Sequence, residues 1–147
     1  MKKVYISGRI SGLPRDQYMR LFFISASMLK KKGYEPVNPT RFWLSKWYKQ
    51  LTKVLGHKTA YNLTLFYDLW RLIHCDLIYK IPGWQQSRGA NIESCVAYHY
   101  KVWPVPKDVI AKIDKRLNKM IIKFENNEKD STFTDRRHAD GELQNDD

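Results

Sequence analysis

Short apolar runs alternate with longer segments of helical periodicity along most of this chain. Val4 to Ser7 is a short β-rich run that ends at Gly8, which predicts a strand. In the segment that follows, apolar positions recur every three to four residues and predict a helix, closed by the cations and glycine of residues 30–33. Residues 34–37 predict a second strand, and Pro36 within it indicates the edge of a sheet.

The rest of the pattern continues this alternation. Aromatic and aliphatic positions predict two helices within residues 41–74, with an interruption at Gly56-His57. Further elements are expected at 77–81 (strand), 87–100 (helix), 102–105 (strand) and 107–124 (helix). The order β-α-β-α-α-β-α-β-α predicts an α/β fold, a Rossmann-like (flavodoxin-like) three-layer sandwich in which helices flank a parallel sheet of four to five strands.

Composition sets the extent of the folded domain. A chain of 147 residues predicts one domain, here residues 1–124. Residues 125–147 are polar, acidic and poor in aliphatic side chains, so we expect a disordered tail. The sequence contains no run of about 18 apolar residues, so we expect no membrane span. The N-terminus enters a strand pattern without a signal-peptide core, and there are only two cysteines, so we expect a reduced, cytoplasmic setting.

Charge is distributed unevenly along the chain. The formal net charge is +11, but residues 125–147 contain eight acids and three bases, which leaves 23 bases and seven acids in residues 1–124. The resulting charge of +16 favours anionic partners, either a nucleic acid or a phosphorylated small molecule. A solvated surface that keeps the protein soluble is an equally good interpretation of the charge alone.

The richest local signal is the segment from Cys75 to Glu93. An apolar strand ends at Pro82-Gly83, a polar loop follows, and Ser87-Arg88-Gly89-Ala90 opens a helix whose first turn is expected to contain Glu93. This places a carboxylate, a hydroxyl, a guanidinium and free N–H groups at the carboxyl end of a strand, where ligands bind in open α/β sheets. The first strand ends in a similar way at Ser7-Gly8-Arg9, so both ends are expected to converge on one site.

Two carboxylates are candidates for catalysis. A helix N-terminus is expected to lower the pKa of Glu93 and keep it ionised, as a nucleophile at the anomeric carbon of a sugar requires. Asp68, on the helix before the strand, could protonate the leaving group. The structural alternatives are that Glu93 is an ordinary residue of a helix start and that Asp68 lies on a solvated face. The four histidines and two cysteines show no zinc-ligand spacing, and Gly8 to Gly12 lacks the Gly-Lys-Ser/Thr of a P-loop.

Four stretches together resemble a known family: residues 5–12, 34–39, 68–76 and 87–93. The chain is similar to the nucleoside 2-deoxyribosyltransferase superfamily, near the 2′-deoxynucleoside 5′-phosphate N-hydrolases and the deoxyribosyltransferase-like proteins of phages and bacteria. Ser87 through Glu93 fits the family pattern Ser-x-Gly-x-x-x-Glu, in which the glutamate is the nucleophile.

The resemblance implies an N-glycosidase or a deoxyribosyltransferase that acts on a nucleoside or, preferably, a nucleoside 5′-monophosphate. Glu93 would attack the sugar, Tyr5 would orient Glu93, and Asp68 would lie near the leaving base. Ser87 and Gly89 would face the phosphate. It implies no metal or cofactor, and a homodimer or larger even assembly whose sites are completed by the neighbouring subunit.

Some residues depart from the family pattern. The first loop has Arg9 before Ser11, whereas the hydrolases tend to have a serine before an arginine, yet both groups could still reach a phosphate. Arg88 replaces a usually apolar residue and is a further candidate phosphate ligand. Trp84, in a loop longer than usual, is a candidate base-stacking wall. The aromatic residues Trp43, Trp47 and Tyr48 lie in a basic segment, 41–61, and at helical spacing they are more often core than ligand contacts.

Two other classes of function remain open from the sequence. One is a protein that binds or senses a nucleotide in the same pocket without turnover. The other is a basic nucleic-acid-binding protein that uses the +16 region and its aromatic side chains. Tyr5, Asp68 and Glu93 together favour the enzyme, because a protein that only binds does not need all three.

Overall fold

The fold is built on one parallel sheet. The computed structural model describes the backbone of residues 1–40 and 42–141 and the side chains of residues 1–40 and 48–129. The strand order is β2-β1-β3-β4, and every pair is parallel. The strands are β1 (Lys3–Ser7), β2 (Glu35–Val37), β3 (Leu77–Lys80) and β4 (Trp103–Pro104). The predicted α/β class is confirmed, and β2, which contains Pro36, is an edge strand.

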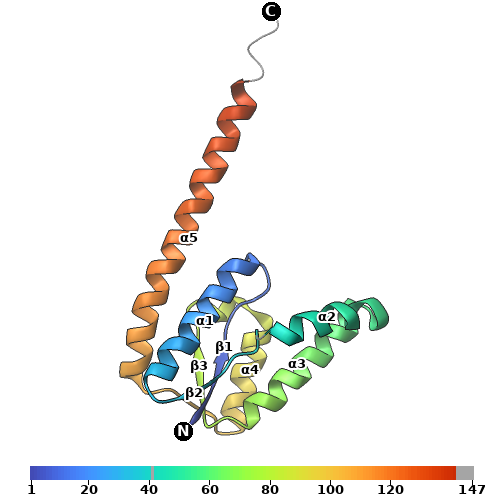
Figure 1. Cartoon of the computed structure of the whole chain (residues 1–147), viewed down its shortest axis with the longest axis vertical. Coiled ribbons are helices and arrows are strands. Elements are labelled where there is room, and N and C mark those ends of the chain that lie inside the picture. The colour runs from blue at the N-terminus through green and yellow to red at the C-terminus, as the bar shows by residue number, and fades with distance from the viewer. Residues whose placement is uncertain (41, 142–147) are drawn as a thin grey trace, which may run out of the picture. The chain divides into compact units, whose positions relative to one another are not determined.

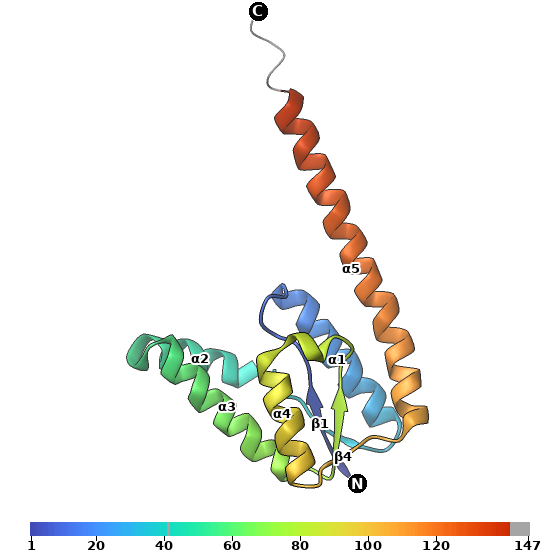
Figure 2. The ribbon, with the colours of Figure 1, turned by 180° about the vertical axis from the view of Figure 1, so that it is seen from behind.

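Helices lie on both faces of this sheet (Figures 1 and 2). One face is covered by α3 and α4, and the other by α1 and the first turns of α5. The bounds are α1 (Arg15–Lys31), α2 (Phe42–Leu55), α3 (His57–Ile73), α4 (Arg88–His99) and α5 (Lys107–Gly141), with a short 3₁₀ turn, η1 (Trp84–Gln86), before α4. The interruption between α2 and α3 falls at Gly56, as predicted, because Gly56 adopts φ +79°.

The central strand β1 directs alternate side chains to opposite faces. Tyr5 packs in a buried cluster with Leu72 of α3 and Ala97 of α4, so the odd-numbered residues of β1 face these two helices. Ser7 therefore points to the same face two residues further on, and both side chains are completely buried. The period of a strand thus places two hydroxyl groups in a row beneath α4.

A close approach requires glycine where β1 ends. A Cβ built on Gly8 would lie 3.1 Å from the side chains of Ile81 and Phe22, closer than most carbon contacts. Gly8 therefore lets the loop after β1 turn directly over the end of β3. This turn brings the first loop to the start of α4.

The C-terminal region differs from the sequence prediction. The chain divides into two compact units, Met1–Leu117 and Asn118–Asp147, so the first ends earlier than the predicted boundary at residue 124. Disorder from Glu125 onward was predicted, but α5 continues through Gly141. The polar composition of this stretch argues against burial, yet no proline or glycine interrupts it before Gly141, so the backbone can stay helical. Residues 142–147 lie outside the described part of the chain.

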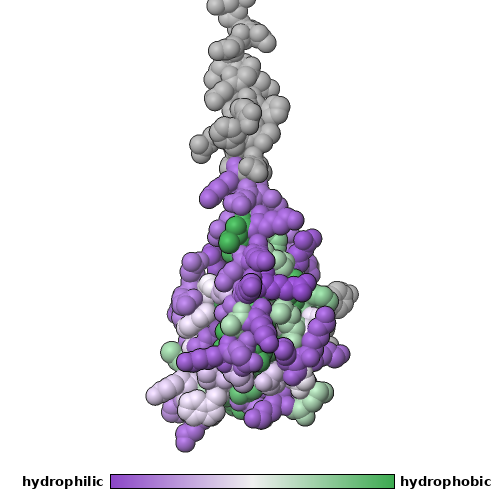
Figure 3. Space-filling model, turned by 90° about the vertical axis from the view of Figure 1, so that its left-hand side faces the viewer, coloured by the Kyte–Doolittle hydropathy of each residue, from purple (hydrophilic) through white to green (hydrophobic). Residues whose placement is uncertain are grey.

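The face of the molecule that Figure 3 shows is largely hydrophilic. Figure 3 shows one side of the molecule, where polar side chains predominate over scattered apolar ones. None of the helices in the described part of the chain is long and apolar enough to cross a membrane.

Candidate active site

A cavity of about 380 Å³ opens beside the carboxyl ends of the strands. Its walls come from the loop after β1, the first turns of α1, the α2–α3 pair and the N-terminal turns of α4. The volume falls within the range of small-molecule sites, roughly 300–1,000 Å³. Six of the residues predicted from the sequence line it: Gly8, Ser11, Asp68, Ser87, Gly89 and Glu93.

Glu93 is a buried carboxylate held by two hydroxyl groups of β1. The Tyr5 hydroxyl donates to Oε1 at 2.7 Å, and the Ser7 hydroxyl donates to Oε2 at 2.5 Å. Each carboxylate oxygen therefore has its own donor, and the carboxylate is fixed at the cavity wall. Glu93 lies in the second turn of α4, not in the first as predicted, because the helix begins at Arg88. Ser7, which was predicted to bind substrate, donates to Glu93 and so holds its carboxylate.

The predicted effect of the helix N-terminus on Glu93 was wrong in direction. Burial raises the pKa of Glu93 above its ordinary value, although the hydrogen bonds from Ser7 and Tyr5 each lower it. The physical reason is that Glu93, one turn further along, is removed from water by the sheet beneath it, and desolvation disfavours the charged form. The two hydroxyl donors oppose this effect and favour the ionised carboxylate.

Tyr5 remains a hydrogen-bond donor at any ordinary pH. Burial first, and then the negative charge of Glu93, raise the pKa of the Tyr5 phenol well above its usual value. A phenol that stays protonated can only donate to the Glu93 oxygen at 2.7 Å. The orienting role that the family resemblance implied for Tyr5 is consistent with this contact.

Asp68 is the second carboxyl of the cavity, and its environment is different. Its buried Oδ1 has no hydrogen-bond partner within the described part of the chain and lies 3.8 Å from Nη1 of Arg71. Burial first, and then the charge of Glu93, raise the pKa of Asp68 to about 7, although Arg71 lowers it. At 3.8 Å the guanidinium attracts the carboxylate but donates no hydrogen bond to it, so it only partly offsets the cost of desolvation. Asp68 can therefore carry a proton near neutral pH.

The start of α4 is ordered by a local hydrogen-bond network. The Ser87 hydroxyl caps the helix by accepting from the Ala90 N–H at 3.3 Å. The Asn91 amide donates to the carbonyls of Gln85 and Ser87, at 2.8 and 2.9 Å. These bonds hold the turn η1 against the helix and fix Ser87 and Gly89 at the cavity wall.

Besides Ser7, three residues predicted to bind substrate do not line the cavity. The Arg9 guanidinium donates to the Ser11 carbonyl at 3.0 Å and to Oε1 of Gln86 at 2.6 Å. Arg88 is exposed and is not among the residues that line the cavity. The Trp84 ring lies 4.2 Å from the Lys80 ammonium, in a cation–π contact rather than in a wall for a base. The side chains of Trp43 and Trp47 lie outside the part of the chain that the structure describes.

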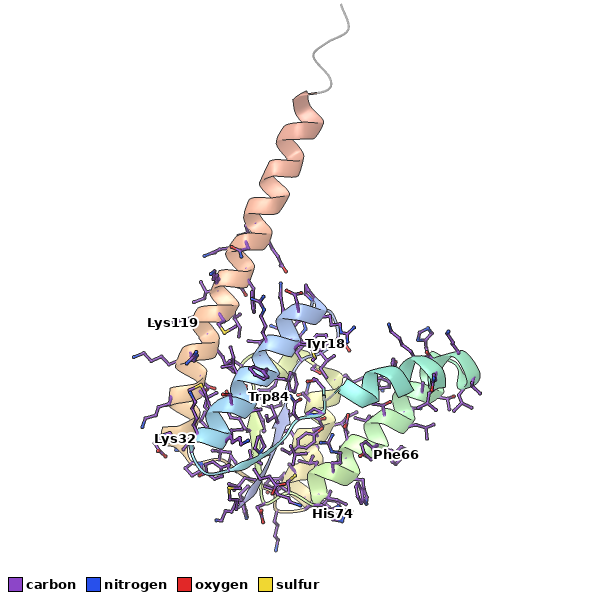
Figure 4. All side chains as sticks on the ribbon, viewed as in Figure 1. Tyr18, Lys32, Phe66, His74, Trp84 and Lys119 are labelled. Carbon is purple, nitrogen blue, oxygen red and sulfur yellow. The ribbon has the colours of Figure 1, made fainter. Side chains whose placement is uncertain are left out.

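The cavity also contains residues that the sequence interpretation did not select. Tyr18 and Arg15 come from α1, Tyr48 from α2, and Tyr61 from α3. Figure 4 labels Tyr18 on α1, at the end of that helix near the first loop. Tyrosines at helical spacing look like ordinary core residues of an amphipathic helix. Of these tyrosines, the sequence interpretation considered only Tyr48 as a ligand contact, together with Trp43 and Trp47. Within the described part of the chain, no three His, Cys, Asp or Glu side chains are grouped so that they could hold a metal ion.

Comparison with protein families identifies one match. Residues 2–103 match the family described as "Domain of unknown function (DUF4406)". The match covers well over half of the chain, so the chain belongs to this family, and it includes every cavity residue named above. Neither the curated proteins nor the solved structures give a match.

Proposed function

We propose that this protein cleaves the N-glycosidic bond of a nucleoside 5′-monophosphate, or transfers its sugar to another base, through a covalent intermediate on Glu93. The observation that carries the proposal is the buried Glu93 carboxylate, held by Tyr5 and Ser7 at the wall of a ligand-sized cavity that also contains Asp68. The resemblance to the deoxyribosyltransferase superfamily supports the same assignment, since its nucleophile pattern ends at Glu93.

In the first step, a Glu93 oxygen attacks the anomeric carbon of the sugar. A C–O bond forms, and the C–N bond to the base breaks with its electron pair leaving on the base nitrogen. A protonated Asp68 gives its proton to the departing base, so the base leaves neutral. The pKa of about 7 suits this role, because Asp68 can give up a proton at neutral pH and recover it.

In the second step, water or a second base attacks the anomeric carbon of the glycosyl ester. The bond to the Glu93 oxygen breaks, the carboxylate is restored, and the Asp68 carboxylate accepts the proton of the incoming water or base. The hydroxyl groups of Tyr5 and Ser7 stabilise the carboxylate as it leaves, since both donate to it. The chain itself supplies a nucleophile and an acid/base pair for this reaction.

Two carboxyl groups with different environments favour catalysis over binding alone. A site that only holds a nucleotide gains nothing from two buried acids, because burial of each costs desolvation and an ionised one repels a phosphate. The family resemblance further suggests a homodimer or larger even assembly, which light scattering of the purified protein would measure.

The test is a base-release assay with a panel of ribo- and deoxyribonucleoside monophosphates. The wild-type protein should release free base, and Glu93→Gln should lower the rate by at least about 10⁴-fold, because it removes the nucleophile. Trapping of a sugar adduct on the peptide that contains Glu93, followed by mass spectrometry, would identify the intermediate.

Glu35→Gln serves as the matched control, since Glu35 is exposed and outside the cavity. It should leave the rate unchanged. Base release that persists in Glu93→Gln would overturn the assignment of the nucleophile. Calorimetric binding of nucleotides without any base release would instead favour a nucleotide-binding protein.

A further inference from the structure

Three arginines lie on the elements that form the cavity, and they are not equivalent. Arg9 follows β1, Arg15 is the first residue of α1, and Arg88 is the first residue of α4. Sequence reasoning favours Arg9 and Arg88 as ligands of a phosphate. The structure permits a choice among the three from their contacts.

Arg9 is engaged in holding two loops together. Its Nε donates to the Ser11 carbonyl within its own loop, and its Nη1 donates to Gln86 of η1, 77 residues away in the sequence. The loop is shaped around this side chain, because a Cβ on Gly12, where φ is +76°, would lie 2.8 Å from Nη2 of Arg9. Arg9 is therefore a positioning residue that ties the first loop to the start of α4.

Arg15 is the cation of the cavity wall. It is the one lysine or arginine among the described residues that line the cavity, and it stands beside Ser11 and Tyr18. Its side chain is exposed, and no hydrogen bond or ion pair occupies its guanidinium within the described part of the chain. The cation that acts on Asp68 is Arg71, so the charge of Arg15 is available to a ligand.

The cavity therefore has two acids and one cation in its wall. The Glu93 carboxylate disfavours a second negative charge near it, whereas the Arg15 guanidinium attracts one. A planar guanidinium can also bind two oxygens of a phosphate at once. An anionic sugar phosphate would for these reasons bind in one orientation, with its phosphate at Arg15 and its anomeric carbon toward Glu93.

We propose that Arg15 is the residue that recognises the phosphate of the substrate and selects nucleotides over nucleosides, while Arg9 only positions the loop. The proposal rests on the proposed function for the identity of the reacting group. The proposal names the residue that determines the preference for nucleotides over nucleosides. Arg15, and not Arg9 or Arg88, then binds the phosphate.

The experiment measures kcat/KM for a nucleoside monophosphate and for the matching nucleoside. Arg15→Ala should reduce the preference for the nucleotide by about 10- to 100-fold, the usual effect of losing a charged hydrogen-bond donor. The loss should appear mainly in KM, with the nucleoside rate unchanged. Arg15→Lys should retain part of the preference, because it keeps the charge but not the paired donors.

Arg88→Ala is the matched control, because Arg88 is also an exposed first residue of a helix but lies outside the cavity lining. It should leave the preference unchanged. Arg9→Ala should lower the rates for nucleotide and nucleoside together, because it loosens the loop. A preference that survives Arg15→Ala, or one that Arg88→Ala alone removes, would overturn the proposal.

A binding measurement separates this proposal from the proposed function. In the Glu93→Gln background, calorimetry with the nucleoside monophosphate and with ribose 5-phosphate reports recognition without cleavage. If the nucleotide binds in a way that depends on Arg15 but the wild-type protein releases no base, the Arg15 proposal is supported and the glycosidase assignment fails. Base release with no discrimination between nucleotide and nucleoside would overturn the Arg15 proposal alone.

Discussion

Glu93 on α4 and Asp68 on α3 line the same cavity, but their surroundings differ. Glu93 faces β1, where Tyr5 and Ser7 donate to both of its oxygens, whereas the buried Oδ1 of Asp68 has no hydrogen-bond partner among the described residues. Burial raises the pKa of both, but only Glu93 has donors that favour its charged form. The difference teaches how two carboxyl groups of one cavity can be held in unlike protonation equilibria, since donors favour the charged form only at Glu93.

After the loss expected for Glu93→Gln, the largest effect is expected from replacing Asp68, which removes its acidic proton. Asp68→Asn should lower kcat for ordinary nucleotides by about 10²- to 10⁴-fold, the usual contribution of a general acid. Because the acid is active only when protonated, the wild-type rate should fall as the pH rises through about 7, and this alkaline limb should disappear in the variant. Initial rates between pH 4 and 9 measure both.

The leaving group sharpens this test. Nicotinamide departs neutral from nicotinamide mononucleotide without receiving a proton, so its release should be much less sensitive to Asp68→Asn. An equal loss with both substrates would show that Asp68 acts through binding or structure and not as an acid.

Asp68→Asn should make the folded protein more stable, although it makes the enzyme slower. The pKa of Asp68 rises from 3.8 to about 7 on folding, so the unfolded chain ionises first and the folded state loses stability as the pH rises from about 4 to 7. Asp68→Asn should therefore increase the free energy of unfolding at pH 8, on the order of 2–4 kcal/mol, with the gain vanishing below pH 4. Urea unfolding at both pH values measures it. A variant less stable than wild type at pH 8 would show that the contact with Arg71 outweighs the desolvation of Asp68.

A smaller effect is expected at the Glu93 wall. Tyr5→Phe removes the hydroxyl that donates to Oε1 and should lower kcat by about 10- to 100-fold, since a hydrogen bond to a charged group contributes about 1.5–3 kcal/mol. It should also move the acid limb of the pH profile upward, because that hydrogen bond lowers the pKa of Glu93.

Tyr79→Phe is the control for this change. Tyr79 is equally buried, but its hydroxyl donates to Asp114 on the other face of the sheet at 2.7 Å. Its loss should destabilise the fold without moving the pH profile. Identical profiles for the two variants would mean that Tyr5 acts only through packing.

The smallest effect is expected at Trp84. Trp84→Ala should leave KM within about twofold and cost under about 1 kcal/mol of stability, because its ring contacts Lys80 and not the cavity. Tyr61→Ala, from the cavity lining, should raise KM more. A tenfold rise of KM in Trp84→Ala would restore the base-stacking interpretation of this tryptophan.

The regular elements were largely predictable, because periodicity reflects which side of each element is buried. Strands, helices and the break near Gly56 follow from the positions of apolar residues and glycines. The helical conformation of residues 125–141 was not predictable, because polar composition reports the absence of a core and not the conformation of the backbone.

The site was predictable in part. Tyr5 and Glu93 are 88 residues apart, and the resemblance to a family, not spacing, paired them before their hydrogen bond was seen. Arg9 and Arg15 look alike in the sequence, since both are cations near the first loop. Only the contact with Gln86, far along the chain, distinguishes the arginine that holds a loop from the one that faces the cavity.

The sequence by itself determined the α/β order, the edge position of Pro36 and the candidates for the catalytic carboxylates. The tertiary structure decided the protonation of those carboxylates and the identity of the free arginine. The physical reason is that helix and strand patterns are local, whereas desolvation and hydrogen bonding depend on groups that distant elements bring together. The same sheet that buries Glu93 supplies the two hydroxyl groups that hold it.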